Sequence, residues 1–433
     1  MLNAIEFEQN NAVVFERFEK SLELKDDATL NHVLHFVIKM ASIALNGCTG
    51  THLPRLDGLM VKTADIVRDQ LQATSPHPGK SIILASELYP YGGHSRIVED
   101  IVASAPGEVI VLLTDYNDNY ARGNLELGAM YKHFRTASVL TIPKGSHISK
   151  VFSVTKFINM VCPDKLYLLL HHADAIGYVA ASAHTVLGLK SFFIHHADQN
   201  PTLGATINNH DHLDICIEHS LKCKKFTSNN CRVLPLYVKD RGSRNANFSR
   251  GLLNVASAGN PGKFCFTGPL NYPARILSSL KNPAIDKYYH FGKLTKIQLK
   301  NIEAHLLDNG LSPDRFRHMS WVESIWKAFL EVDVHVLIGT APVGGGKTAI
   351  EAQGAGVPVL WYYDEISKDF KSSLNRITSI YESSELSWSN LENLDSAISK
   401  VTENYSKYSL NSRKFYEKHF NKEQFKKSLD LEV

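Results

Sequence analysis

The chain has 433 residues, of which 44% are hydrophobic and 21% are charged, and its formal net charge is +3. This length is sufficient for two domains that each bury a core, and the composition is that of an ordinary soluble globular protein. A net charge so close to zero gives no support for nucleic acid as a partner, so none is expected.

Residues 1–78 show helical periodicity, with apolar residues three and four positions apart over 30–45. A first series of apolar strands alternating with helices follows. Its strands are predicted at 81–86, 108–114, 137–142, 165–170 and 190–194. This alternation is typical of a doubly wound parallel sheet.

A second series is predicted after an irregular linker over 235–262. Its strands are predicted at 263–267, 288–291, 316–319, 334–338 and 357–361. We therefore expect an α/β protein with a helical extension over 1–78, a first Rossmann-like domain over 79–240, a second over 260–400 and a helical tail over 401–433. Ligands are expected where the carboxyl ends of the parallel strands meet.

The six cysteines contain no CxxC pair, which is typical of reduced thiols in a cytosolic protein. A zinc site drawn from Cys216, Cys223, Cys231 and His219 fits no common ligand spacing, so no metal is expected. No apolar run is expected to span a bilayer, and the polar N-terminus is unlike a signal peptide. We expect a cytoplasmic protein. The basic, aromatic tail over 407–427 is interpreted as a helix packed on its own domain, with attraction to a membrane surface as the alternative.

The most informative segment is the glycine-rich turn after the strand predicted at 334–338. Its residues, Ala341-Pro-Val-Gly-Gly-Gly-Lys-Thr348, match a Walker A motif except that Ala341 replaces the first glycine. Glycines let the backbone approach an anion, and the N–H groups at the start of the next helix point at it. The turn therefore fits either the P-loop of an ATPase or kinase or the diphosphate site of a nucleotide-sugar enzyme.

The position of this turn argues against the ATPase. A P-loop normally follows the first strand of its domain, whereas mostly helical, polar residues follow Thr348. The run from Val359 to Asp364 imitates a Walker B strand, but no clear strands come after it. We therefore rank a sugar nucleotide above ATP as the ligand.

In the first domain, a Gly-Gly-His-Ser-Arg sequence follows the first strand. Gly93 can bring backbone close to a ligand, while His94 and Arg96 supply polar reach on the acceptor side.

A His-His-Ala-Asp tetrad occurs twice, at 171–174 and 195–198, each time at the end of a predicted strand. These residue types indicate general-base catalysis, hydrogen bonding of a hydroxylated substrate or metal binding. Metal binding is disfavoured because adjacent histidines point to opposite sides of an extended chain. We expect the second tetrad to act, with His195 and Asp198 as candidate catalytic residues and His196 on the acceptor side.

In the second domain, Trp321 is a candidate neighbour of a nucleobase, although a place in the core fits it equally well. Glu351 lies one helical turn after Lys347. A carboxylate there would accept the ribose hydroxyls while the helix N-terminus holds the diphosphate.

Taken together, three segments resemble the GT-B glycosyltransferases, the class built from two Rossmann-like domains. YPYGGHSRIVEDI resembles the N-terminal glycine turn of that class, and APVGGGKTAIEAQGAGVPVL resembles its donor signature. FFIHHADQNPTLG followed by HDHLDICI resembles bacterial surface-polysaccharide and protein glycosyltransferases. The resemblance runs in order over about 81–361.

This resemblance implies a metal-independent transferase with Glu351 at the donor ribose and Gly93 near the donor phosphate or the acceptor. It implies that the following residues lie at the donor diphosphate: Gly345, Gly346, Lys347 and Thr348. Retaining members with a Glu-x7-Glu signature carry an acid where this chain has Val343, which leaves the stereochemistry open.

The expected function is sugar transfer from a nucleotide-sugar to a hydroxyl of a glycan, a lipid-linked glycan or a protein. Asp198 or His195 is the candidate base, and Lys347 the cation beside the leaving diphosphate. The alternatives are a P-loop ATPase or kinase, a non-catalytic GT-B-like scaffold and a sugar-nucleotide epimerase. The donor, the acceptor, the oligomeric state and the role of the N-terminal helices stay open.

Overall fold

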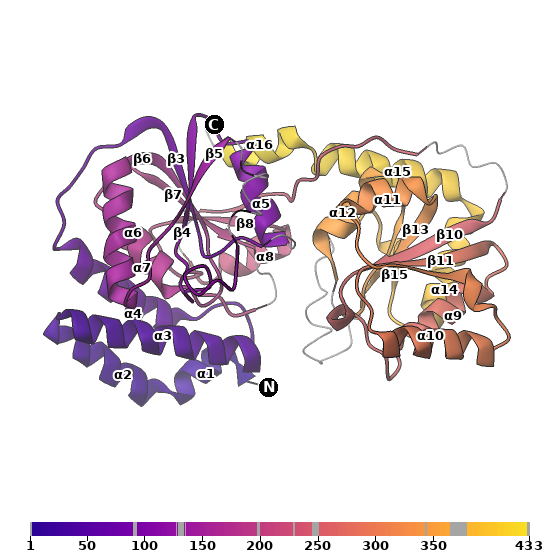
Figure 1. Cartoon of the computed structure of the whole chain (residues 1–433), viewed down its shortest axis with the longest axis horizontal. Coiled ribbons are helices and arrows are strands. Elements are labelled where there is room, and N and C mark those ends of the chain that lie inside the picture. The colour runs from indigo at the N-terminus through magenta and orange to yellow at the C-terminus, as the bar shows by residue number, and fades with distance from the viewer. Residues whose placement is uncertain are drawn as a thin grey trace. The chain divides into compact units, whose positions relative to one another are not determined.

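The computed structural model describes residues 2–89, 93–126, 128, 134, 136–196, 200–227, 230–244, 251–342, 344–363 and 379–430. The chain divides into two compact units. Unit 1 comprises Met1–Leu234 with Lys426–Val433, and unit 2 comprises Pro235–Phe425. Each unit contains one large parallel sheet flanked by helices (Figure 1).

The sheet of unit 1 has the strand order β5-β4-β3-β6-β7-β8-β9, with every neighbouring pair parallel. Its strands are β3 (His77–Ala85), β4 (Glu108–Leu113), β5 (Ala137–Thr141), β6 (Pro163–Leu169), β7 (Lys190–His195), β8 (Asp211–Asp214) and β9 (Cys231–Val233). From β3 the chain adds β4 and β5 toward one edge of the sheet, and it then returns to add β6 to β9 toward the other edge. The order of the strands therefore switches between β3 and β6. Ligands of open α/β sheets bind at such a switch point, beyond the carboxyl ends of the strands.

Helices α6 and α7 pack on one face of this sheet, and α5 lies on the opposite face (Figure 1). The helices of unit 1 are α1 (Ala4–Asn10), α2 (Ala12–Ser21), α3 (Asp27–Gly47), α4 (Pro54–Arg68), α5 (Gly93–Val102), α6 (His147–Val161), α7 (Ala175–Ala183) and α8 (Ile217–Cys223). One continuous cluster of buried apolar side chains runs from α3 and α4 through α6 and α7 to the sheet. The N-terminal helices therefore share the core of unit 1.

Helix α3 is long and apolar enough to cross a membrane by length and composition alone. The expectation that no such run exists is corrected here. In the structure α3 contacts α4, α6 and α7. It buries eight of its 21 residues, including Leu30, Val37 and Met40, against them.

The sheet of unit 2 has the strand order β12-β11-β10-β13-β14-β15, again parallel throughout. Its strands are β10 (Leu253–Ala258), β11 (Ile285–Phe291), β12 (Phe316–Met319), β13 (Val334–Ile338), β14 (Val359–Tyr362) and β15 (Ser387–Trp388). The switch point lies between β10 and β13. The expectation of two doubly wound α/β units is thus confirmed.

Two groups of helices cover this sheet. Helices α9 (Tyr272–Lys281), α10 (Lys296–Asp308) and α14 (Leu391–Glu403) lie together on one face, and α11 (Ile325–Glu331), α12 (Gly346–Gly354) and α15 (Tyr405–His419) on the other (Figure 1). Helix α16 (Lys422–Asp430) is the last helix of the described residues. In the division of the chain, its residues up to Phe425 belong to unit 2 and those from Lys426 on to unit 1.

The strand predicted at 263–267 is wrong, because the first strand of unit 2 is β10, inside the predicted linker. Phe264 instead fills a loop, where its ring packs 4.3 Å from Tyr272 and 5.1 Å from His290. Phe264 is therefore apolar because it packs inside this loop, and not because it belongs to a strand. The short strands β8, β9 and β15 were not predicted, since two to four residues carry too little pattern.

Candidate functional site

The glycine-rich turn of unit 2 lies between β13 and α12. Helix α12 begins at Gly346, and Gly345 at its N-cap offers no side chain to accept the first N–H groups. These groups and the positive end of the helix dipole favour an anion at this end of the helix. Gly344, Gly345, Gly346, Lys347 and Thr348 are all partly exposed there.

Lys263, the last residue of a short 3-10 helix after β10, reaches this turn. It was not selected from the sequence because it fell in a predicted strand. Its Nζ donates to the carbonyl oxygen of Gly344 at 3.3 Å. A Cβ at Gly345 would come within 3.4 Å of the same Nζ. The bare backbone of the turn thus lies beside the amine of Lys263, and Lys347 follows as the second residue of α12.

The carboxyl edge of this sheet is built from closely approaching glycines. Gly259 follows β10, Gly292 follows β11 and Gly339 follows β13, and each donates its N–H to the neighbouring strand. Gly292 has φ of 126°, and a Cβ there would meet the carbonyl oxygen of Gly259 at 2.2 Å. Glycine at these positions lets the ends of neighbouring strands and their loops approach one another closely.

The remaining donor-side candidates lie along the same edge. Glu351 is partly exposed on the second turn of α12, so Lys347 and Glu351 share one helix face. Trp321 follows β12 and is 60% exposed, which places it at the surface rather than in the core. Two strands separate β12 from β13, a span of roughly 14 Å, so one extended ligand would be needed to touch both Trp321 and the turn.

In unit 1, three partly exposed histidines gather where β6, β7 and α5 meet. The ring of His196 lies 5.0 Å from that of His94 and 5.7 Å from that of His172. They come from the start of α5, the residues after β6 and the residue after β7. We name His94, His172 and His196 the histidine cluster, and it lies at the switch point of the sheet.

Each ring of the histidine cluster is oriented by one hydrogen bond. His94 Nε2 is 2.9 Å from the carbonyl oxygen of Leu169, and His196 Nδ1 is 3.4 Å from that of Ile194. A carbonyl only accepts, so both ring nitrogens are donors. Nδ1 of His94 has no hydrogen-bond partner among the described residues. The unprotonated nitrogens are therefore Nδ1 of His94 and Nε2 of His196.

His172 completes this arrangement through Thr202. Thr202 Oγ1 donates to the carbonyl of Asn200, so it accepts from Nδ1 of His172 at 3.1 Å. Burial lowers the pKa of His94 to about 4 and that of His172 to about 3, and it lowers the pKa of His196 well below its usual value. The cluster is thus neutral at pH 7 and suited to accept hydrogen bonds from hydroxyl groups.

A buried carboxylate supports the cluster from below. Asp174 caps α7 through the N–H of Gly177 at 3.0 Å, and it accepts from Ser86 at 2.6 Å and from Thr114 at 2.5 Å. Ser86 in turn accepts the N–H of His171 at 2.7 Å. The acid of the first tetrad therefore joins the ends of β3, β4 and β6, a structural role.

The structure separates the residues of the second tetrad. His195 is fully buried against Phe193, so its side chain does not reach the surface that a substrate would touch. This burial argues against the predicted role of His195 as a catalytic base. Its neighbour His196 lies in the histidine cluster, and Asp198 lies outside the described residues.

Of the other acceptor-side candidates, Gly93 is the exposed first residue of α5 and directly precedes His94. Arg96 is partly exposed on the same helix and forms an ion pair with Glu99 at 2.6 Å. Gly93 thus lies at the histidine cluster, while the guanidinium of Arg96 is engaged along its own helix.

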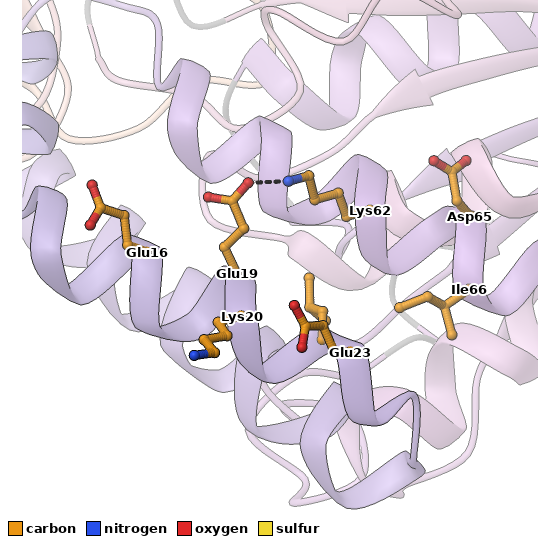
Figure 2. Close-up of a pocket in the computed structure, with 8 residues that line it drawn as sticks. Glu16, Glu19, Lys20, Glu23, Lys62, Asp65 and Ile66 are labelled. Atoms are coloured by element: carbon orange, nitrogen blue, oxygen red, sulfur yellow. Dashed lines mark hydrogen bonds and ion pairs between the residues drawn. The ribbon is translucent and has the colours of Figure 1, made fainter.

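A separate groove lies among the N-terminal helices, between α2 and α4 (Figure 2). Charged side chains line it, and Lys62 forms an ion pair with Glu19 across it. It is remote from the sheet edges and mixes both signs of charge at the surface. Exposed pairs of this kind indicate solvated helices rather than a site.

Comparisons with known proteins address the fold. A scan against models of protein families finds no match, and a search of curated proteins finds none either. Among solved structures, a lysine-to-methionine variant of Thermobaculum terrenum O-GlcNAc transferase superposes with a TM-score of 0.52 at 12% identity, over 96% of this chain and 79% of that one.

Two further structures agree. A glycosyltransferase from Rickettsia africae gives a TM-score of 0.56 at 12% identity, over 82% of this chain and 98% of that one. A variant of S. aureus TarM in complex with fondaparinux, alpha-GlcNAc-glycerol and UDP gives 0.54 at 9% identity, over 81% and 99%. The chain therefore has the GT-B fold of these glycosyltransferases, as the sequence motifs predicted.

Proposed function

We propose that the protein is a glycosyltransferase that moves a sugar from a nucleotide-sugar donor to an acceptor hydroxyl. The observation that carries this is the turn between β13 and α12. It combines an uncapped helix N-terminus, consecutive glycines and the two amines of Lys263 and Lys347. That combination suits a diphosphate.

In this proposal unit 2 holds the donor. The α12 N-terminus with Gly345, Gly346 and Thr348 binds the diphosphate, and Glu351 accepts the ribose hydroxyls. Trp321 contacts the far end of the nucleotide. The acceptor oxygen attacks the anomeric carbon while the bond from that carbon to the phosphate oxygen breaks. Lys347 and the helix dipole stabilise the charge that develops on the departing diphosphate.

Unit 1 holds the acceptor through the histidine cluster. Imidazoles with a pKa near 3 or 4 are weak general bases at pH 7, since a base works best when its pKa is near the working pH. We therefore assign His94, His172 and His196 to positioning the hydroxyl. Asp198 keeps its place as the candidate base.

The second candidate function is a P-loop ATPase, which the Ala341–Thr348 sequence favours. In unit 2 this turn follows the fourth strand along the chain, β13, rather than the first, β10. The amine of Lys263 also donates a hydrogen bond to the carbonyl oxygen of Gly344, on the turn itself. Both features suit the donor site better than a phosphate-wrapping P-loop.

The test is thermal unfolding of the full chain in the presence of UDP, GDP, CMP, dTDP, ADP or Mg-ATP, with UDP first because the TarM neighbour was crystallised with it. A nucleotide at 100 times its Kd stabilises the protein by about 2.7 kcal/mol. We expect this shift with one diphosphate nucleotide, its loss in Lys347→Ala, and its retention in the exposed control Lys300→Ala on α10. A shift with Mg-ATP alone would replace this proposal by the ATPase.

A further inference from the structure

A second group of polar side chains lies inside unit 1, away from the histidine cluster. It consists of His195 at the end of β7, His212 and Asp214 on β8, and Cys223 at the end of α8. One ligand atom from each of the four lies within 4.8 Å of all the others. All four side chains are at most 1% exposed.

Three of the donor atoms form a nearly equilateral triangle. Nδ1 of His195 is 3.4 Å from Oδ1 of Asp214 and 3.3 Å from Sγ of Cys223. Sγ of Cys223 is 3.2 Å from the same carboxylate oxygen. Tetrahedral zinc with bonds of about 2.0–2.3 Å holds its ligand atoms roughly 3.3–3.8 Å apart. The triangle has the size of one face of such a tetrahedron, and a ring nitrogen of His212 lies within 4.8 Å of all three atoms.

Hydrogen bonding within the group does not satisfy it. Among the described residues, Nε2 of His195, both ring nitrogens of His212 and Oδ2 of Asp214 have no partner. A buried polar atom left without a partner destabilises the fold. The hydrogen bond from Cys223 accounts for one oxygen of Asp214, and His195 is bonded to Cys223. His212 is left with no hydrogen bond among the described residues, so these bonds do not explain why it is buried here.

A divalent ion explains both the donors and the charge. A thiolate from Cys223 and the carboxylate of Asp214 together carry two negative charges, which Zn²⁺ neutralises, and both imidazoles bind in their neutral form. Binding releases the thiol proton of Cys223 to solvent. Nitrogen, oxygen and sulfur ligands in one closed set suit zinc better than magnesium or calcium, which prefer oxygen alone.

We propose that unit 1 holds one structural zinc ion through His195, His212, Asp214 and Cys223. The ion joins the end of β7 to β8 and α8. His195 directly precedes His196, so the zinc also fixes the backbone from which His196 enters the histidine cluster. This inference does not depend on the proposed sugar transfer, because its test reads metal and not turnover.

The first test measures zinc by mass spectrometry in the full chain, purified without chelator. We expect ~1 zinc per chain. Cys223→Ser should lose it. Cys231→Ser should keep it, because Cys231 is a buried thiol on the adjacent strand β9 that lies outside the group. No zinc in the wild-type chain, or equal zinc in both variants, would overturn the proposal.

The second test needs no variant and so holds even if Cys223→Ser fails to fold. The wild-type protein is stripped with a chelator and loaded with Co²⁺. A thiolate-to-cobalt charge-transfer band together with the visible bands of tetrahedral cobalt is the expected result. Cobalt that binds without a thiolate band, or does not bind, would overturn the assignment of Cys223 as a ligand.

Discussion

A single buried carboxylate fastens the loop after β7 to the N-terminal helices. Asp57 on α4 accepts the N–H groups of Gly204 at 2.7 Å and Thr206 at 2.8 Å, and the hydroxyl of Thr206 at 2.6 Å. Gly204 has φ of 84°, and its Cα lies against Tyr178, where a Cβ would meet the ring at 2.5 Å. The loop that carries Thr202 to His172 is thus held by Asp57 from α4, together with backbone hydrogen bonds from Thr202 to Thr51 and from Leu203 to His172.

We predict that Asp57→Ala lowers the free energy of unfolding by about 3 kcal/mol, because it leaves buried N–H groups without an acceptor. Urea unfolding measures this loss. Asp65→Ala is the matched control on the same helix, where an exposed ion pair with Arg68 is expected to be worth less than about 1 kcal/mol. Equal losses in the two variants would contradict the prediction.

At the scale of elements, the two ends of α12 have different roles, and a glycine stands at each end. Its first turn faces the proposed diphosphate, while its last residue, Gly354, lies on the ring of Trp326. A Cβ at Gly354 would come 2.0 Å from this ring. The ring is fully buried and donates its indole N–H to the carbonyl of Gly242 at 2.7 Å, so it has no room to move.

Gly354→Ala is therefore expected to destabilise unit 2 by roughly 3 kcal/mol, as overpacking of a rigid core does. The control is Gly58→Ala on α4, where a Cβ meets nothing within 4 Å. There alanine should raise stability by about 0.5–1 kcal/mol through its better helix propensity. Thermal unfolding of both variants decides the matter, and a neutral Gly354→Ala would show that Trp326 can shift.

Over the whole molecule, two buried groups are expected to change stability with pH in opposite directions, Glu8 in unit 1 and His290 in unit 2. In unit 1, burial raises the pKa of Glu8 to about 7, although the N–H groups of Arg55 and Leu56 partly counter this. The folded state thus keeps the proton of Glu8 between pH 4.5 and 7 while the unfolded chain loses it. Stability falls across this window as pH rises, by up to about 3 kcal/mol.

In unit 2, burial lowers the pKa of His290 to about 3, with His318 as a lesser cause. The ring stays neutral in the fold, bonded to the hydroxyl of Tyr272 at 2.7 Å. The unfolded chain takes up this proton below about pH 6.5, so stability falls as pH drops, by up to about 1.4 kcal/mol per pH unit.

Hydrogen exchange of peptides from each unit, measured in urea between pH 4.5 and 8, separates the two effects. Glu8→Gln should remove from unit 1 the contribution that falls as pH rises from 4.5 to 7. His290→Asn should remove from unit 2 the contribution that falls as pH drops below 6.5. The exposed Glu23→Gln serves as the control and should leave both profiles unchanged. A difference in stability between wild type and Glu8→Gln in unit 1 that stays the same from pH 4.5 to 8 would contradict the assignment to Glu8.

How much of the fold could be predicted from the sequence depended on whether a feature follows from neighbouring residues or from contacts between distant segments. Mostly apolar runs such as Val109–Leu113 and Val334–Ile338 identified the central strands, because a strand buried on both faces must be apolar along most of its length. The glycine turn and its helix were also recognisable, because consecutive glycines occur mainly where the backbone adopts an unusual conformation or approaches a ligand closely. The order of these local signals sufficed to predict two doubly wound units.

Contacts between distant segments decided the rest. His195 and His196 are adjacent and identical in type, yet one is buried beside Asp214 and Cys223 and the other lies in the histidine cluster. Neighbouring residues on a strand point to opposite sides, but only the packing of α8 and the placing of β8 beside β7 determine which side is the interior. The same holds for Lys263, whose amine reaches Gly344 from 81 residues away. Periodicity encodes where an element begins and ends, while the partners of a side chain follow from the tertiary fold alone.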